Sequence, residues 1–175
     1  FDLYDKRKNE LDILVNILYG GMTSKLWLAL REINPIVYGL NVSYELLEEG
    51  GIFVITLSFE KKKINDTIKY LLKELKDIKK NILNEKDFKR LKDMEINDLI
   101  IYNNETLEIA DYYGTQLILE EEIESYKDLK NIYQKINRKD IKRLCNEILD
   151  FNNCILLQVG DINNKNIKKL FYENI

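Results

Sequence analysis

The sequence predicts an α+β fold, in which an antiparallel sheet carries helices layered on one face. Two segments with alternating apolar and polar residues flank a turn, and together they predict a β-hairpin over residues 38–59. Most of the remaining chain has helical periodicity, and a single proline leaves those helices uninterrupted. Strands and helices that are grouped rather than alternating are typical of the α+β class.

The composition indicates one folded domain and excludes several classes of function. The chain has 175 residues, 45% of them hydrophobic, and a net charge of −3. Because there is no basic excess, we expect no nucleic-acid partner. No apolar run approaches the roughly 20 residues of a membrane helix, so we expect no membrane span. Two isolated cysteines favour a reducing intracellular compartment, which is the cytoplasm, or a mitochondrion or plastid if a transit peptide was lost.

The first expected helix lies between a strand end and a glycine pair. Residues 1–5 read as the end of a strand, and Asp5 is the expected N-cap. Apolar residues then recur at helical spacing at positions 11, 14, 15 and 18. Gly20 and Gly21 end this helix, because glycine tolerates the left-handed conformation that follows a helix terminus.

A second helix follows the glycine pair. Thr23 or Ser24 is its expected N-cap, and Asn34-Pro35 ends it, because the residue before proline disfavours the helical conformation. The residues expected on its apolar face are Leu26, Trp27, Leu30 and Ile33.

The hairpin is the clearest strand signal in the chain. Its first strand places Tyr38, Leu40, Val42, Tyr44 and Leu46 on one face. Residues 48–51, which read EEGG, are typical of a tight turn. The return strand, over residues 52–59, places Phe53, Ile55, Leu57 and Phe59 on one face.

Helical periodicity dominates the rest of the chain. Asn84, with Asp87 three residues later, resembles a capping box. Thr106 is the expected cap of the following helix. The apolar residues of that helix are Leu107, Ala110, Tyr113, Leu117 and Ile118. The expected elements are helices over 64–78, 84–102, 106–119, 126–136 and 140–149, a buried strand over 154–161, and a helix over 163–174.

Residues 1–175 are expected to form a single domain, with no internal repeat and no linker. A hairpin with one further strand makes a thin sheet. We therefore expect that a first strand precedes residue 1 and that the chain is a fragment.

The sequence lacks histidine, a residue that many catalytic and zinc sites use. The sequence has no histidine, so it has no zinc motif of the H-x-x-E-H kind and no base for a serine nucleophile. Carboxylate-only zinc sites are unusual, and the acidic run Glu120, Glu121 and Glu122 is more simply a solvated helix end. Cys145 lies on an apolar helix face, which indicates core packing. We therefore expect this chain to bind no metal.

Arg31 and Tyr38 are the remaining candidates for chemistry. In the simpler interpretation, Arg31 is a surface residue that complements a helix C-terminus and Tyr38 is an aromatic on a half-buried strand. In the other interpretation, both point into one cleft. There a guanidinium and a phenol are donors that can hold a peptide carbonyl and the oxyanion that forms from it.

The stretch from Leu18 to Leu40 resembles the insulinase/pitrilysin family of zinc metallopeptidases, which includes the mitochondrial processing peptidases. The second half of that family reads like L-G-G-G-x-S-S-R-L-F-x-x-L-R-E-x-x-x-x-x-Y-x-V. The residues that match are Leu18, Gly20, Gly21, Ser24, Leu26, Leu30, Arg31, Glu32 and Tyr38. Tyr19, Thr23, Lys25, Trp27 and Leu40 replace other motif residues, and Pro35 is atypical. Weaker similarity to later family helices extends over almost the whole chain.

The resemblance implies a role for Arg31 and Tyr38 in a larger enzyme. In this family an N-terminal half binds zinc and closes with a C-terminal half around a peptide substrate. The resemblance makes this chain the C-terminal half, with Tyr38 donating to the substrate carbonyl and its oxyanion and Arg31 anchoring a substrate carbonyl. Zinc is then bound by the other half, which is part of the same chain or a separate subunit, and the isolated chain is expected to be inactive.

Two other functions remain open on the sequence. One is a non-catalytic scaffold or substrate-binding subunit of the same family, since the core subunits of respiratory complex III resemble these peptidases. Retention of both Arg31 and Tyr38 favours the active assembly over a scaffold. The other is an unrelated helical α+β interaction module, which a different sheet architecture would indicate.

Overall fold

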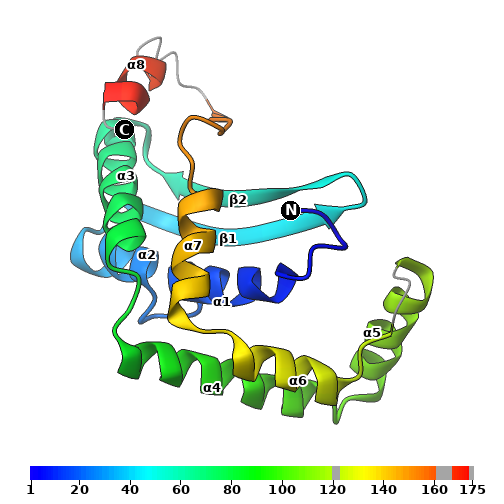
Figure 1. The fold of residues 1–175 in the computed structure, drawn as a ribbon. Helices are drawn as coiled ribbons and strands as arrows, with labels where there is room; N and C mark the ends of the chain where they lie inside the picture. The colour runs from blue at the N-terminus through cyan, green and yellow to red at the C-terminus, as the bar shows by residue number, and fades with distance from the viewer. Residues whose placement is uncertain (120–122, 161–166, 174–175) are drawn as a thin grey trace.

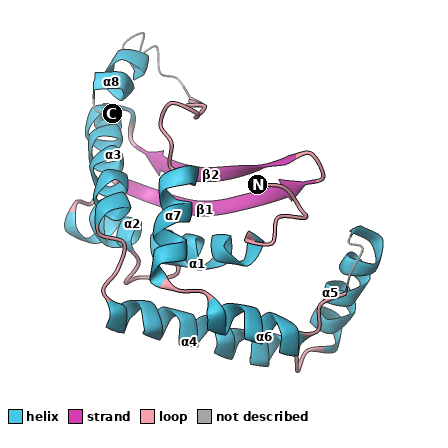
Figure 2. Cartoon of the chain, in the orientation of Figure 1, coloured by secondary structure: helices cyan, strands magenta, loops and turns pink. Residues whose placement is uncertain are grey.

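The computed structural model describes residues 1–119, 123–160 and 167–173, and it has the predicted α+β class (Figure 1). A two-stranded antiparallel sheet, made of β1 (Val37–Leu47) and β2 (Gly50–Phe59), carries helices on one face (Figure 2). The helical elements are α1 (Lys8–Tyr19), α2 (Lys25–Trp27), the π-helix η1 (Leu28–Ile33), the 3-10 turn η2 (Lys61–Lys63), α3 (Ile64–Lys80), α4 (Glu85–Tyr102), α5 (Thr106–Leu119), α6 (Tyr126–Lys135), α7 (Arg138–Ile148) and α8 (Ile167–Glu173).

The hairpin follows the predicted alternation along most of its length. Leu47 pairs with Gly50, so Glu48 and Glu49 form a two-residue turn. The inward side chains of β2 (Phe53, Ile55, Leu57 and Phe59) pack against the core, as the sequence predicted. The opposite face of the sheet carries mostly polar side chains and is exposed.

Tyr38 departs from that alternation. Val37 pairs with Phe59, whereas Gly39 pairs with Ser58, so Tyr38 is an extra residue in a β-bulge. The bulge keeps Val37 buried and leaves Tyr38 65% exposed. The expectation that Tyr38 shares the face of Leu40 is therefore wrong.

Helix α1 lies at the centre of the core. It contacts β1, α2, α4, α6 and α7, and its buried apolar residues are Leu11, Ile13, Leu14, Ile17 and Leu18. Gly20 ends α1 with an ordinary φ of −76°, and Gly21 has the positive φ, at 118°. The glycine pair therefore turns the chain, but Gly21 alone needs the conformational freedom of glycine.

The second predicted helix changes geometry halfway along. It begins as α2, with Ser24 as its N-cap, and continues as η1 to Ile33, with Asn34 as the C-cap. Leu26 and Leu30 are buried as predicted, but Ile33 is 73% exposed. A π-helix has more residues per turn than an α-helix, so the residue at the end of the run no longer faces the core. Assignment of Ile33 to the apolar face was therefore wrong.

Side-chain caps fix the starts of the later helices. Asn84 accepts from the backbone N–H of Asp87, as the sequence predicted, and Ser125 and Asn137 form capping boxes at α6 and α7. Two other expected caps were wrong. Arg7 rather than Asp5 occupies the N-cap of α1, and Thr106 is already the first residue of α5.

Two expected strands are absent from the described residues. Residues 1–5 form turns, although the N–H of Leu3 donates to the carbonyl of Leu47 at 3.0 Å. Residues 154–160 have no strand partner, and Ile155 is 96% exposed. A strand needs a neighbour for its backbone groups, and no described segment supplies one there. Asp161 lies outside the described residues, as does the beginning of the helix expected over 163–174.

No helix in the described ranges is long and apolar enough to cross a membrane. The apolar side chains expected on α5 also have little cover from this chain, since Leu107, Leu117 and Ile118 are exposed.

Leu14 tests the central position of α1. Its side chain is fully buried, so we expect Leu14→Ala to lower the free energy of unfolding by about 2–5 kcal/mol in urea titrations. Leu107→Ala, at a position that is 79% exposed, is the matched control and should change it by no more than about 0.5 kcal/mol. Equal losses in the two variants would contradict the central position of α1.

Candidate functional site

Arg31 lies in η1, near the end of the second helical segment. Its Nη1 group donates to the backbone carbonyl oxygen of Tyr38, and its guanidinium stacks over the Trp27 ring at 4.7 Å. Trp27 is held in turn by its Nε1–H, which donates to Glu32 Oε1 at 3.0 Å. The arginine is therefore fixed on an aromatic surface rather than extended into solvent.

Tyr38 presents its phenol at the start of β1. The bulge turns the ring outward, and its hydroxyl donates to the carbonyl oxygen of Phe59 at 3.4 Å, which is a long and weak hydrogen bond. The hydroxyl can therefore exchange this contact for a stronger acceptor at little cost.

The Arg31 guanidinium contacts the backbone of Tyr38, whereas a cleft shared by the two side chains stays a prediction. The contact runs from the Arg31 guanidinium to the backbone of Tyr38, and it joins the end of η1 to the start of β1. A guanidinium has five N–H donors, so the bond to Tyr38 leaves others for a ligand. Together the two side chains can donate hydrogen bonds to an extended peptide or to another carbonyl-rich group.

Sequence reasoning missed the two features that create this arrangement. Trp27 was assigned to an apolar face, and its contact with Arg31 was not predicted, although residues four apart lie on the same side of a helix. The bulge at Tyr38 was not predicted either. Pro35 before β1 and Gly39 at the bulge are the local signals of irregular backbone there.

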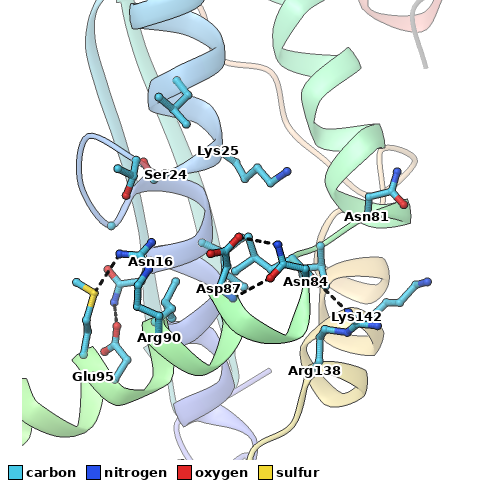
Figure 3. A pocket seen from close by; sticks show the side chains of 18 of the residues that line it. Asn16, Ser24, Lys25, Asn81, Asn84, Asp87, Arg90, Glu95, Arg138 and Lys142 are labelled. Carbon is cyan, nitrogen blue, oxygen red and sulfur yellow. Dashed lines mark hydrogen bonds between the residues drawn. The ribbon is translucent and has the colours of Figure 1, made fainter.

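A cavity of about 800 Å³ lies on another part of the surface. It is lined by α1, α2, α4, α7 and the connection between α3 and α4, and neither Arg31 nor Tyr38 is among its described lining residues. Figure 3 shows the charged side chains Lys25, Arg90, Glu95, Arg138 and Lys142 around it. Arg138 is partly engaged, since it donates to the carbonyl of Leu83 at 3.0 Å.

Glu95, in this cavity, is the most perturbed carboxyl group of the site. Burial raises its pKa to about 7, and repulsion from Asp12 and Asp98 adds to the shift, while the hydrogen bond from the Asn16 amide opposes it. Sequence reasoning did not single out Glu95, because it is one of several acids on a helix of mixed charge.

Asp12, on α1, is hydrogen-bonded to two tyrosines from other elements. Its carboxylate accepts from the hydroxyls of Tyr44 at 2.6 Å and Tyr133 at 2.5 Å, which join α1 to β1 and α6. Burial raises the pKa of Asp12, and the two tyrosine hydrogen bonds oppose that shift. Burial and the nearby Asp12 carboxylate also raise the pKa of both tyrosines. These groups join three elements of the core, and Asp12 and Tyr133 also line a second pocket of about 250 Å³.

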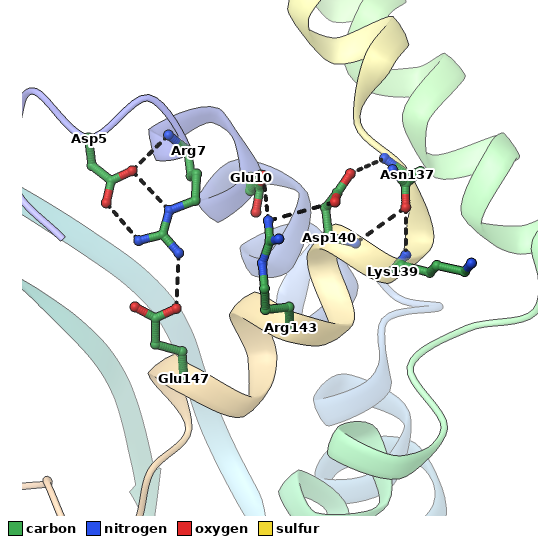
Figure 4. Close-up of polar contacts among 8 residues, drawn as sticks. All are labelled: Asp5, Arg7, Glu10, Asn137, Lys139, Asp140, Arg143 and Glu147. Carbon is green, nitrogen blue, oxygen red and sulfur yellow. Dashed lines mark hydrogen bonds and ion pairs between the residues drawn. The ribbon is translucent and has the colours of Figure 1, made fainter.

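Ion pairs fasten the start of α1 to α7 (Figure 4). Arg7 bonds Asp5 at 2.9 Å and Glu147 at 3.0 Å, and the bond from Arg7 lowers the pKa of Asp5. Arg143 lies 3.7 Å from Asp140 and 4.0 Å from Glu10, whose pKa is raised by burial. This surface orients the helices and contains no group that is free to act as a nucleophile.

The residues of this chain do not fit a zinc site. Within the described parts of the chain, no three His, Cys, Asp or Glu side chains come close enough to hold a metal ion, and the sequence contains no histidine. Cys145 is buried in the core, and burial raises the pKa of its thiol to about 11, so it is not a ready nucleophile.

The Glu95 carboxyl predicts a specific pH dependence of stability. Its pKa is about 7 in the folded protein, against an ordinary 4.5, so folding favours the protonated form. We expect the free energy of unfolding to be highest below about pH 4.5 and to fall by about 2–3 kcal/mol as the pH rises through 7. Urea titrations at pH 5 and pH 7.5 measure that difference.

Glu95→Gln should remove most of this difference in the free energy of unfolding between pH 5 and pH 7.5. The raised pKa of Asp12 should account for a smaller difference that remains. Glu48→Gln, at the exposed hairpin turn, is the matched control and should leave the pH dependence unchanged. An undiminished pH dependence in Glu95→Gln would show that this carboxyl is not its source.

Comparison with known proteins places this architecture in a family. Residues 2–95 match the sequence profile of a family described as the peptidase M16 inactive domain. A search of curated proteins found no match.

Three solved structures share the fold. A protease from Helicobacter pylori has a TM-score of 0.71 and 18% identity, over 83% of this chain and 35% of its own. A conserved protein from Enterococcus faecalis has a TM-score of 0.70 and 16% identity, over 81% and 33%. An M16-like peptidase from Alicyclobacillus acidocaldarius has a TM-score of 0.69 and 14% identity, over 81% and 33%.

This chain therefore spans about a third of the length of each of these structures. The profile match covers more than half of the chain, from before α1 into α4, and includes Arg31 and Tyr38. The chain belongs to the insulinase/pitrilysin (M16) peptidase family, as its inactive C-terminal domain.

Proposed function

We propose that this chain is the C-terminal half of a zinc metalloendopeptidase and closes over a peptide substrate held against a zinc site in an N-terminal half. The observation that carries the proposal is the joint presentation of Arg31 and Tyr38. A cation–π contact, a hydrogen bond and a β-bulge hold both residues at one exposed point. A domain that served only as a scaffold would have no need of this arrangement.

Tyr38 and Arg31 have different roles in this proposal. The phenol of Tyr38 leaves the weak bond to Phe59 and donates to the carbonyl oxygen of the scissile bond, most strongly when that oxygen becomes an oxyanion. Arg31 donates to a substrate carbonyl through the N–H groups that Tyr38 does not occupy. Neither residue activates water or transfers a proton.

The zinc ion and the nucleophilic water belong to the N-terminal half on this proposal. The sequence has no histidine, and the described residues form no cluster of three metal-ligating side chains, so we place the metal in the N-terminal half, in the same polypeptide or a separate subunit. We also propose that residues 1–175 form one domain that lacks its first strand. The two-stranded sheet and the exposed apolar segment at residues 155–159 support that view.

Tyr38→Phe tests the oxyanion role in the assembled enzyme. Removing one such donor lowers kcat by about 100- to 1000-fold, so we expect that loss with the zinc content unchanged. Tyr4→Phe, at another exposed tyrosine, should retain wild-type turnover. Wild-type turnover in the Tyr38→Phe enzyme would remove this role and favour a scaffold function for the domain.

The isolated chain provides a second test. Because it lacks histidine, we expect it to retain no stoichiometric zinc after dialysis, as measured by elemental analysis, and to cleave no peptide. One tightly held zinc per chain, or peptide hydrolysis by the chain alone, would contradict the assignment of the metal to the other half.

A further inference from the structure

The acidic residues of this chain are concentrated in one segment. Residues 93–126 contain ten of the 30 Asp and Glu residues and none of the 27 Lys and Arg residues. This segment comprises the C-terminal half of α4, the whole of α5 and the connection to α6. Figure 1 shows that α5 rises from the end of α4 at the side of the molecule opposite α2. This part of the sequence is strongly negative, although the whole chain has a net charge of only −3.

The same segment exposes large apolar side chains. They are Met94, Ile100, Ile101, Tyr102, Leu107, Leu117, Ile118, Leu119 and Ile123. Leu107 is 79% exposed and Ile118 82%. A run of acidic residues by itself is usually a solvated surface, but a solvated surface has no reason to carry this much apolar area.

On α5 these side chains form a continuous stripe. Leu107, Ala110, Gly114, Leu117 and Ile118 lie along one side of the helix at helical spacing, and Glu108 and Asp111 border it. We call this surface the α5 stripe.

The other side of α5 packs against the chain that follows it. Gln116 is buried, and its side-chain oxygen accepts from the N–H of Glu124 at 2.6 Å. The Tyr112 ring packs against Tyr126 with 4.6 Å between centroids. These contacts cover the side of α5 opposite the α5 stripe and leave the stripe exposed.

Gly114 lies in the middle of the α5 stripe, and none of the residues that the structure describes requires a glycine there. A Cβ atom at this position would have no heavy atom within 4 Å, and its φ is not in the positive range. Glycine in a helix interior costs about 1 kcal/mol relative to alanine. The missing side chain leaves a gap in the exposed apolar stripe. A side chain or the helix backbone of a partner can pack into such a gap.

We propose that the α5 stripe is a docking surface for a basic amphipathic helix of a partner subunit, packed across Gly114. The apolar side chains of such a helix cover Leu107, Leu117 and Ile118, and its lysines or arginines pair with Glu108 and Asp111. Nucleic acids and anionic membranes are repelled by the same charges. This inference does not depend on the peptidase function, because it uses neither Arg31 nor Tyr38.

The test measures binding of chain 1–175 to three labelled 18-residue peptides by fluorescence anisotropy. The first is an amphipathic helix of Leu, Ala and Lys, the second has the same composition in scrambled order, and the third has Glu in place of Lys. We expect the first to bind at least about tenfold more tightly than the other two, and added salt to weaken it. Equal binding of the scrambled peptide would show only charge attraction and would overturn the proposal.

Three variants locate the site. Gly114→Leu should weaken binding of the first peptide at least about tenfold, while the melting temperature stays the same or rises, because an added Cβ meets no described heavy atom and glycine is a poor helix former. Glu108→Lys combined with Asp111→Lys should weaken it similarly. Glu48→Lys combined with Glu49→Lys, at the hairpin turn, matches that charge change elsewhere and should leave binding unchanged.

Wild-type affinity in Gly114→Leu would overturn the proposal, as would an equal loss in the hairpin variant. Sedimentation of the free chain adds an independent check, since we expect a monomer. A dimer that Gly114→Leu dissociates would mean that a second copy, and not a basic partner helix, covers the α5 stripe.

Discussion

Burial of α1 is the constraint on which the rest of the structure depends. This helix lies between the hairpin and the helices α4, α6 and α7, so its apolar residues contribute to almost every interface of the core. Asp12 makes the position of α1 specific as well as stable, because its carboxylate must satisfy tyrosine hydroxyls from both β1 and α6. A buried carboxylate with a missing partner is costly, so these three elements assemble in one arrangement.

The arrangement of Arg31 and Tyr38 follows from this core. Leu26 and Leu30 are fixed against it, and Val37, Leu40 and Val42 fix the start of β1. The segment between these anchors is irregular, with a π-helix on one side and a β-bulge on the other. Irregular backbone of this kind persists when the surrounding packing determines it, and it commonly occurs where side chains serve a ligand. Both candidate residues are therefore positioned by core packing that neither of them contributes to.

The surfaces that this chain leaves uncovered have different characters. The outer face of the hairpin is mostly polar, which suits solvent, whereas residues 155–159 and the α5 stripe are apolar. Apolar surface of this extent is typical of contacts with other polypeptide. The matched segments cover only 33–35% of the related structures, so those proteins contain further chain beyond the matched domain.

Local sequence alone determined the α+β class, most helix boundaries, the hairpin, and Arg31 and Tyr38 as the candidate residues. Those features depend on periodicity, capping residues and one short motif, all of which act over a few neighbouring residues. Only the tertiary structure decided that Ile33 points outward, that Tyr38 lies in a bulge, that Trp27 supports Arg31, that Glu95 is perturbed, and that residues 154–160 have no strand partner. Most of these depend on contacts between segments distant in the chain, where packing and burial override the local pattern, whereas Trp27 and Arg31 lie about one helical turn apart.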